Sequence, residues 1–283
     1  MFGYRHNFHA GNYADVVKHV VLTSLLQALQ QKNKPFYLQD SHGGIGLYDL
    51  SSHEADKNRE YLSGISRLWQ APNPIAHPAA VQRYLDIVRS FNSSGELRYY
   101  PGSPRLGRAL LRANDRMVVT ELNTIDCEIL KREFNGDKQV TVHLQDGYQG
   151  IKAYLPPAER RGLVLIDPAY ELKDEYTRLV CGLQNGYQRW STGIYAIWYP
   201  LMSKPIRDDF FEALKATGIR KILTAELSIS PLQAEKSMCG SGMIIINAPW
   251  LLDQQLKSEL EWLWPLLSDS KEGGVNVEWL VPE

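Results

Sequence analysis

Seven short apolar segments alternate with helix-length segments along the chain, and this alternation constrains the fold more than any other feature. The segments are 35–40, 117–122, 139–144, 163–167, 192–200, 221–227 and 242–249. Several are runs of Val, Ile and Leu without polar alternation, which is typical of parallel strands buried on both faces. The sequence therefore predicts an α/β fold with a seven-stranded, mostly parallel sheet, whose closely spaced last strands allow an antiparallel edge.

The alternation stops between residues 50 and 100. Two amphipathic patterns in this segment, HEADKNREYLSGISRLW and PAAVQRYLDIVRSFN, predict helices around the proline-containing stretch APNPIAHP. The segment shows no strand pattern. We therefore expect a core formed by residues 1–49 and 101–283, with residues 50–100 as a helical insertion subdomain.

Composition and cysteine spacing favour a globular protein of a reducing compartment. Hydrophobic residues make up 44% of the chain and charged residues 22%. Cys127, Cys181 and Cys239 lie far apart and form no CxxC pair. No apolar run approaches the roughly 20 residues of a membrane span, and the first residues show no secretory apolar core. We expect a cytoplasmic protein without membrane association.

The net charge of −1 provides no general attraction to nucleic acid, so any basic surface has to be local. Between residues 98 and 116 five arginines accompany a single acid, Asp115. The arginines are Arg98, Arg105, Arg108, Arg112 and Arg116. They fit either a basic face toward RNA phosphates or an ordinary solvated helix surface. The sequence leaves both interpretations open.

Polar residues lie directly after several of the predicted strands. An open parallel sheet binds its ligands beyond the carboxyl ends of its strands, so these residues are candidates for a binding site. The first strand leads into DSHGGIG, where glycines such as Gly44 let the backbone pass close to a ligand. Glu121 ends the second strand and can accept both hydroxyls of a ribose. Asp146, followed by Gly147, comes after the third and can accept a hydrogen bond from an adenine amine. A tight turn without a ligand and ordinary helix caps are the alternatives.

The most specific local pattern is LVLIDPAY at 163–170. An apolar strand stops at Asp167, Pro168 makes the turn rigid, and Tyr170 lies three residues beyond the acid. The segment resembles the [D/N]-P-P-[Y/F/W] motif of amino-group methyltransferases, with Ala169 in place of the second proline. A plain strand-ending turn is the alternative.

These residue types suit methyl transfer to an aromatic amine, whose lone pair is delocalised into the ring. Hydrogen bonds from the amine to Asp167 and to the carbonyl of Pro168 favour a tetrahedral nitrogen with an available lone pair. Tyr170 can stack on the base. Much of the rate then comes from positioning the methyl group in line with the nitrogen, while Asp167 or water takes the proton.

Histidines gather in the first part of the chain. Four of the seven lie within the first 42 residues, namely His6, His9, His19 and His42. His19 lies within a predicted first helix at 12–31, and the other three lie outside it. Asn12 or Asp15 is near the cap position of this helix. No cysteines and no group of carboxylates accompany them as further metal ligands. The cationic sulfonium cofactor of amino-group methyltransferases does not require a metal. We therefore expect no metal site.

The chain as a whole resembles the RlmJ family of large-subunit (23S) ribosomal RNA adenine-N6 methyltransferases. The resemblance rests on YRHNFHAGNYADVVKH, DSHGGIG, RYYPGSP, TEL, the DG at 146–147, RRGLVLIDPAYE, TGIYAIWYP, SGMIIINAPW and WLVPE, in this order. It implies a Rossmann-like class I S-adenosylmethionine-dependent methyltransferase fold, with a small helical insertion. It also implies a monomer that methylates N6 of an adenine in protein-free 23S ribosomal RNA.

The resemblance also implies roles for individual residues. Asp167 is expected to be the catalytic acceptor, with Tyr170 beside it, and Tyr4 is expected to contact the RNA substrate. The expected S-adenosylmethionine contacts are Lys18, His19, His42, Gly44, Ser103, Glu121, Asp146, Gly147 and Asp167. The residues alone had pointed to Glu121, Asp146 and Asp167, whereas His19, Ser103 and Tyr4 rest on the resemblance.

Two other functions fit parts of the sequence. A methyltransferase of protein glutamine side chains uses a similar motif, usually with Asn at the first position, so Asp167 favours adenine. A non-catalytic RNA-binding module would account for the arginines but not for the series of acids at strand ends.

Overall fold

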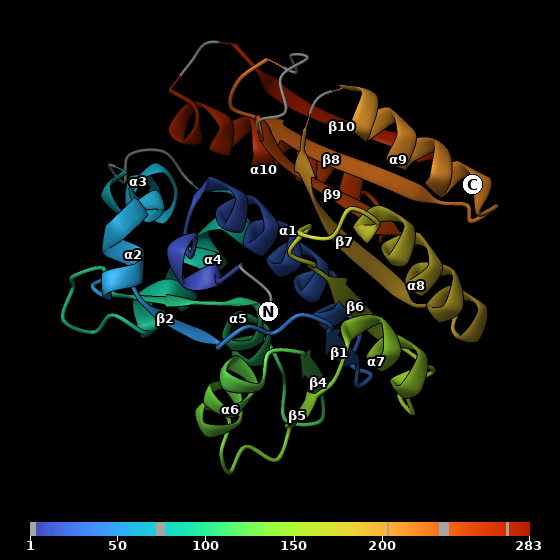
Figure 1. The fold of residues 1–283 in the computed structure, drawn as a ribbon, viewed down its shortest axis with the longest axis horizontal. Coiled ribbons are helices and arrows are strands. Elements are labelled where there is room, and N and C mark those ends of the chain that lie inside the picture. The colour runs from blue at the N-terminus through green and yellow to red at the C-terminus, as the bar shows by residue number, and fades with distance from the viewer. Residues whose placement is uncertain (1–3, 72–76, 203, 232–237, 270–271) are drawn as a thin grey trace.

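A central eight-stranded sheet organises the computed structural model, which describes residues 4–71, 77–202, 204–231, 238–269 and 272–283 (Figure 1). Its strands are β1 (Tyr37–Asp40), β4 (Arg116–Glu121), β5 (Val140–Leu144), β6 (Gly162–Ile166), β7 (Ile194–Leu201), β8 (Ile222–Ser228), β9 (Gly240–Ile246) and β10 (Gly274–Val281). Their order across the sheet is β10-β8-β9-β7-β6-β1-β4-β5. Strand β1 therefore lies inside the sheet, where the order reverses between β4 and β6.

The pairing confirms the predicted Rossmann-like class I methyltransferase fold. The five strands β5, β4, β1, β6 and β7 are all parallel to one another. Strand β9 pairs antiparallel with β7 and β8, which confirms the predicted antiparallel edge. The number of strands was wrong, because β10 adds an eighth that pairs antiparallel with β8. Its apolar residues alternate with Asn276 and Glu278, since this edge strand is only partly buried.

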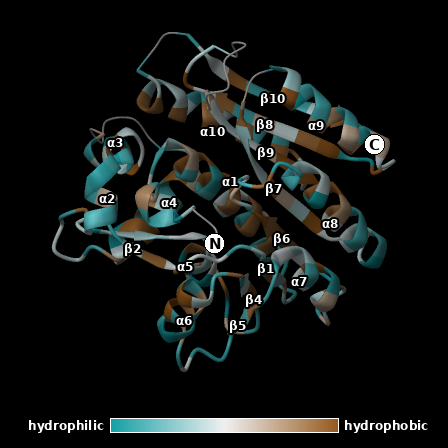
Figure 2. Cartoon of the chain, in the orientation of Figure 1, coloured by the Kyte–Doolittle hydropathy of each residue, from teal (hydrophilic) through white to brown (hydrophobic). Residues whose placement is uncertain are grey.

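Helices cover both faces of the sheet. One face packs against α1 (Tyr13–Gln30), α5 (Ser103–Ala109), α6 (Thr124–Glu133) and α10 (Leu252–Leu267). The other packs against α7 (Gly147–Tyr154), α8 (Glu175–Arg189) and α9 (Lys204–Ala216). Figure 2 shows hydrophobic colour along the central strands and more hydrophilic colour on the outer helices. Neighbouring residues of β1 alternate between these two cores, with Leu38 in one and Tyr37 in the other.

Helix α1 confirms the predicted first helix and is the most deeply buried helix near the site. The side chain of Asn12 caps it by accepting a hydrogen bond from the backbone N–H of Asp15 at 2.9 Å. Its contacts extend to α4 (Ala79–Ser90), α5, α10 and strand β9. Polar side chains on α1 are therefore buried within the protein instead of facing solvent.

The segment 50–100 contains the expected helices. They are α2 (His53–Asn58), the 3₁₀ helix η2 (Glu60–Ser63), α3 (Ile65–Gln70) and α4. The expectation of no strand was wrong at its border, where β2 (Leu47–Asp49) pairs antiparallel with β3 (Tyr99–Pro101). Helix α4 buries Tyr84 and Leu85 in the same core as α1. The division into a core and a subdomain stays a prediction, and residues 72–76 of the proline-containing stretch lie outside the described residues.

None of the helices within the described ranges has the length and apolar character needed to cross a membrane.

Candidate active site

A cavity lies beyond the carboxyl ends of β1, β4, β5 and β6, the edge at which the sequence predicted a ligand site. All of the expected site residues except Tyr170 line it, namely Tyr4, Lys18, His19, His42, Gly44, Ser103, Glu121, Asp146, Gly147 and Asp167. They come from the segment before α1, from α1 itself, from the start of α5, and from the ends of the four strands and the segments that follow them. The fold thus brings together residues that are far apart in the sequence.

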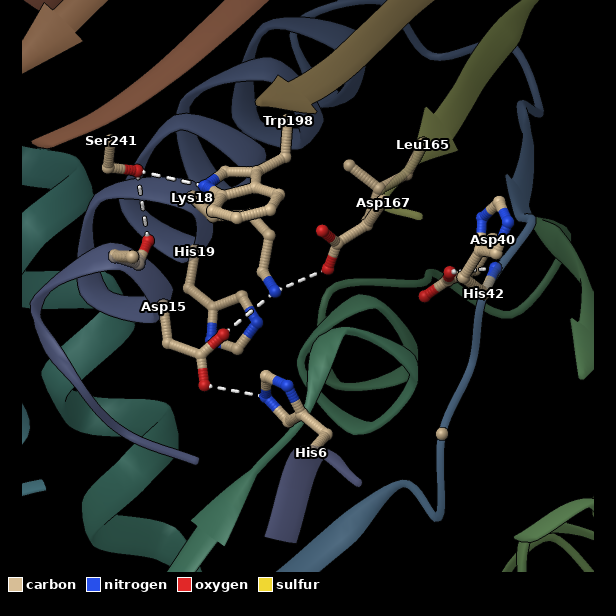
Figure 3. A network of polar contacts seen from close by, with 12 residues as sticks. His6, Asp15, Lys18, His19, Asp40, His42, Leu165, Asp167, Trp198 and Ser241 are labelled. Carbon is tan, nitrogen blue, oxygen red and sulfur yellow. Dashed lines mark hydrogen bonds and ion pairs between the residues drawn. The ribbon is translucent and has the colours of Figure 1, made fainter. Parts of the chain in front are cut away.

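Lys18 links α1 to the motif that follows β6. Its Nζ donates to Asp167 Oδ2 at 2.5 Å and forms an ion pair with Asp15 Oδ1 at 2.8 Å (Figure 3). Only 5% of the Lys18 side chain is exposed. Burial alone would lower its pKa, but the two carboxylates raise the pKa of Lys18 above its usual range. Lys18 is therefore a charged group that holds one oxygen of Asp167.

The other oxygen of Asp15 joins the segment before α1 to this network. Asp15 Oδ2 accepts a hydrogen bond from Gly11 N at 2.9 Å and lies 2.8 Å from His6 Nε2. Burial would raise the pKa of Asp15, but His6 and Lys18 hold it well below the usual range. In the sequence Asp15 is a candidate helix cap, and His6 has no predicted role. The local pattern that could have revealed this network is the pair of polar residues, His6 and Asp15, close to the capped start of a buried helix.

Tyr4 lies at the end of the same network. Its hydroxyl hydrogen-bonds to His6 Nδ1 at 2.8 Å, and its ring stacks on His9 with centroids 5.2 Å apart. His9 Nδ1 in turn lies 2.8 Å from Glu60 Oε1 in η2. Because 37% of Tyr4 is exposed, the ring can contact a second molecule at the cavity.

Glu121 supports the glycine loop after β1. Its Oε2 accepts from Gly44 N at 2.8 Å, and its Oε1 accepts from Asn123 N at 2.7 Å. Gly44 has φ of +59°, and a Cβ there would lie 2.3 Å from the hydroxyl of Tyr48. The position therefore requires glycine for two reasons. Burial raises the pKa of Glu121.

Asp146 and Gly147 begin α7 beside the cavity. Asp146 Oδ1 accepts from Gln149 N at 3.0 Å, so this residue is a helix cap, as the alternative interpretation held. Its Oδ2 also pairs with Arg178 at 3.0 Å. A Cβ on Gly147 would lie 2.4 Å from the carbonyl oxygen of Ser41. The glycine thus allows α7 to approach the loop that follows β1.

Two histidines, the buried His19 and the partly buried His42, face the cavity in their neutral form. Burial lowers the pKa of His42 to about 4 and that of His19 to about 3. His42 Nδ1 lies 2.8 Å from Ser41 Oγ. His19 Nδ1 lies 2.8 Å from the hydroxyl of Tyr100, while its Nε2 has no hydrogen-bond partner among the described residues. Within those residues no group of three or more His, Cys, Asp or Glu side chains could hold a metal ion.

Tyr170 is the one expected site residue that is not part of the cavity lining. Its hydroxyl donates to the carbonyl oxygen of Trp198 at 2.6 Å, and its ring packs edge-on against the Trp198 indole. Its φ of +54° is uncommon for a residue with a side chain. Trp198, which the sequence analysis did not single out, therefore determines where the ring of Tyr170 lies. Pro168 and Ala169 of the same motif do line the cavity.

The five arginines between residues 98 and 116 do not form the basic face that the sequence allowed. Each pairs with an acid: Arg98 with Asp49, Arg105 with Glu133, Arg108 with Asp137, Arg112 with Asp115 and Arg116 with Glu159. Arg116 also begins β4, whereas Glu121 at the cavity ends it. Arg116 therefore lies at the end of β4 away from the cavity, and the ion pairs favour the ordinary solvated surface, one of the two interpretations that the sequence left open.

Comparisons with known proteins identify the family of the chain. The family model "Ribosomal RNA large subunit methyltransferase D, RlmJ" matches residues 33–281. The chain is 47% identical to ribosomal RNA large subunit methyltransferase J of Escherichia coli K12 over 283 residues, and 48% identical to the Haemophilus influenzae protein of the same name over 284 residues. These matches cover 100% of each chain.

A solved structure extends the comparison to the fold. A protein from Legionella pneumophila is 35% identical, with a TM-score of 0.87, and the match covers 96% of this chain and 98% of that one. The two named enzymes match over the full length and the family model over residues 33–281, so no large part of the chain lies outside the comparisons. The chain therefore belongs to the RlmJ family of ribosomal RNA large subunit methyltransferases.

Proposed function

We propose that this protein transfers a methyl group from S-adenosylmethionine to N6 of an adenine in 23S ribosomal RNA. The observation that carries the proposal is the carboxylate of Asp167, held 2.5 Å from Lys18 in a cavity that also contains Glu121 and Asp146. Asp167 is suited to bind the reacting amine, and Glu121 and Asp146 are suited to bind a nucleoside. The names of the relatives, which specify large-subunit ribosomal RNA, support the substrate.

The residues present fit S-adenosylmethionine. Glu121 would hold the ribose hydroxyls and Asp146 the adenine amine, while Gly44 and Gly147 lack the side chains that would fill this part of the cavity. The rest of the cofactor would be contacted by Lys18, His19, His42, Ser103 and Asp167. When bound, the cofactor supplies an activated methyl group on a cationic sulfur.

Asp167 binds the reacting amine, and Lys18 holds Asp167 in place. Lys18 binds Oδ2 of Asp167, which leaves Oδ1 to accept a hydrogen bond from the substrate. The carbonyl of Pro168 can accept the second proton of the amine. These two acceptors orient the nitrogen, and Asp167 or a water molecule takes the proton that the amine loses.

Tyr4 and Tyr170 would hold the target base. Tyr4 already presents its ring at the cavity, where it can contact the RNA. Tyr170 packs against Trp198, so a stacking role requires one face of its ring to remain accessible from the side of Pro168. Flipping an adenine out of a stacked helix costs a few kcal/mol and less in a loop, so a stem-loop is a better substrate than a perfect duplex.

We further propose that the protein acts in the cytoplasm as a monomer on protein-free ribosomal RNA, as the family resemblance implies. A protein glutamine methyltransferase is not favoured, because Asp167 occupies the position at which those enzymes usually carry Asn.

The decisive experiment incubates the purified protein with labelled S-adenosylmethionine and one of three acceptors. These are a protein-free 23S RNA stem-loop, a matched RNA duplex and a glutamine-containing peptide. The stem-loop should be labelled fastest, and the label should map to N6 of adenine. Preference for the peptide would favour the protein-modifying alternative. Absence of calorimetric binding of S-adenosylmethionine would favour a non-catalytic RNA-binding module.

Tyr4 offers a matched pair of variants for the substrate. Tyr4→Phe keeps the ring but removes the hydrogen bond to His6, whereas Tyr4→Ala removes both. We expect Tyr4→Ala to reduce RNA methylation strongly with little change in cofactor affinity, and Tyr4→Phe to have a smaller effect. Equal rates for the wild type and Tyr4→Ala would argue against contact between this ring and the RNA.

A further inference from the structure

Two buried tyrosines form a hydrogen-bonded chain that ends on a histidine of the cavity. The hydroxyl of Tyr84 in α4 donates to that of Tyr100 in β3 at 3.1 Å, and the Tyr100 hydroxyl lies 2.8 Å from His19 Nδ1. Both tyrosines are 0% exposed and His19 is 1% exposed. The rings of Tyr100 and His19 stack with centroids 5.5 Å apart, so the three side chains are packed as one unit.

The direction of this chain determines the tautomer of His19. Each hydroxyl has one proton, and within the described residues the Tyr84 hydroxyl hydrogen-bonds to Tyr100 alone. If Tyr100 donated back to Tyr84, the buried Tyr84 proton would have no acceptor, which costs about 1–3 kcal/mol. Donation from Tyr84 to Tyr100 and from Tyr100 to Nδ1 uses every proton. In that arrangement Nδ1 is an acceptor, so the ring proton of a neutral His19 is on Nε2.

The Nε2 atom is the unused end of the chain. It is buried, it has no partner among the described residues, and its ring lines the cavity. Figure 3 shows the His19 ring extending from α1 on the side from which Lys18 also projects. Because burial lowers the pKa of His19 to about 3, the ring is an uncharged donor at neutral pH. Buried N–H groups are normally paired, so this one needs an acceptor from outside the chain, either a bound ligand or an ordered water.

We propose that Tyr100, supported by Tyr84, is a positioning residue that holds His19 in the Nε2–H tautomer, so that His19 donates a hydrogen bond to an acceptor group of the cofactor. The proposal rests on the proposed function for the identity of the cofactor. With Glu121 and Asp146 assigned to the nucleoside, the methionine carboxylate is the acceptor that remains for α1. A neutral donor binds it without adding a positive charge near the sulfonium.

The proposal also gives a role to the segment that interrupts the α/β pattern. Tyr84 lies in α4, and Tyr100 lies in the strand that returns the chain to the sheet. The insertion would therefore determine the protonation of a residue at the active site, in addition to covering α1.

The test measures the tautomer first, because that measurement does not require a cofactor. Long-range ¹H–¹⁵N correlation spectra of the full chain, with His19 assigned by comparison with His19→Gln, should show the Nε2–H form in the wild type. Tyr100→Phe should shift His19 toward the Nδ1–H form. Tyr84→Phe should largely retain the Nε2–H form, because Tyr100 can still donate to Nδ1. An Nδ1–H form in the ligand-free wild type would overturn the proposal even if Tyr100→Phe failed to fold.

Binding provides the second readout, with S-adenosylhomocysteine as the calorimetric probe. Tyr100→Phe should weaken binding by about tenfold, the equivalent of one hydrogen bond to a charged group. Tyr195→Phe is the matched control, because Tyr195 is equally buried and donates a single hydrogen bond to the Trp190 carbonyl in the other core. It should bind as the wild type does. Tyr100→Phe that binds with wild-type affinity and keeps the Nε2–H form would refute the proposal.

The two measurements separate this proposal from the proposed function. A wild-type protein with the Nε2–H tautomer that does not bind S-adenosylhomocysteine would contradict the cofactor assignment, and with it the proposed donation to the cofactor, but not the tyrosine chain. Wild-type binding with the opposite tautomer would contradict the tyrosine chain alone.

Discussion

Lys18 Nζ lies 2.5 Å from Asp167 Oδ2, although the two residues are 149 positions apart in the chain. The contact joins a buried helix to the turn after β6. Because Lys18 also pairs with Asp15, it balances two carboxylates that would otherwise repel one another.

Replacing Asp167 should separate cofactor binding from catalysis. Asp167→Asn keeps the shape of the side chain but cannot take a proton from the amine, so turnover should fall by about 10²-fold. Calorimetric affinity for S-adenosylhomocysteine should change little. Asp174→Asn, at an exposed position of the same loop, is the control and should methylate RNA normally. Wild-type turnover in Asp167→Asn would contradict the proposed role.

Removing the ammonium of Lys18 should lower both stability and activity. In Lys18→Met the buried Asp15 loses its lysine partner, and breaking a buried pair in this way costs about 3 kcal/mol. The measurement is the free energy of unfolding in urea, together with the methylation rate. Lys131→Met removes an exposed i,i+3 pair with Glu128 and should leave stability essentially unchanged. Equal stability of the two variants would contradict the network.

Glu121→Gln should weaken cofactor binding. The amide keeps the size of the side chain but loses the charge, and one of its two ends now presents N–H groups to the N–H of Gly44 or Asn123. We expect affinity for S-adenosylhomocysteine to fall by about tenfold or more. Hydrogen exchange should also increase in residues 43–46, because the glycine loop loses an acceptor. Glu128→Gln, at an exposed position of α6, should change neither quantity.

Asp40 should make stability depend on pH. It ends β1, is 1% exposed and has an unpartnered Oδ2 among the described residues, and burial raises its pKa from 3.8 to about 7. The protonated carboxyl therefore contributes stability that is fully present below about pH 4 and is lost as the pH rises toward 7. Above that range both the folded and unfolded states are ionised and the effect is constant.

Urea unfolding of the wild type and Asp40→Asn at several pH values isolates this contribution. The stability of Asp40→Asn relative to the wild type should increase between about pH 4 and pH 7 and then level off. Asp174→Asn, at an exposed position, is the control measured in parallel. A constant difference between Asp40→Asn and the wild type would show that Asp40 has an ordinary pKa in the folded protein.

The candidate site was partly visible in the sequence because its acids directly follow buried strands. Glu121, Asp146 and Asp167 each come after an apolar run, and parallel strands bring such positions to one edge of the sheet. His19 and Ser103 have no such local pattern and were found through the family resemblance. Tyr170 fits the motif in sequence, but its contacts with Trp198 place it outside the cavity lining.

The α/β class, seven of the eight strands, the first helix and the residues at strand ends could all be predicted from the amino-acid sequence. These features depend on hydrophobic periodicity and on short motifs, which are properties of neighbouring residues. The eighth strand escaped because a half-exposed edge strand has a weak pattern.

Tertiary structure alone decided which charges and hydroxyls meet. It paired Lys18 with Asp167, directed Tyr100 to His19, and paired Arg108 with Asp137. Each of these contacts joins segments that are distant in the chain. Their partners depend on how the helices pack on the sheet, because charge and hydrogen bonding act over a few ångströms in space whatever the separation in sequence.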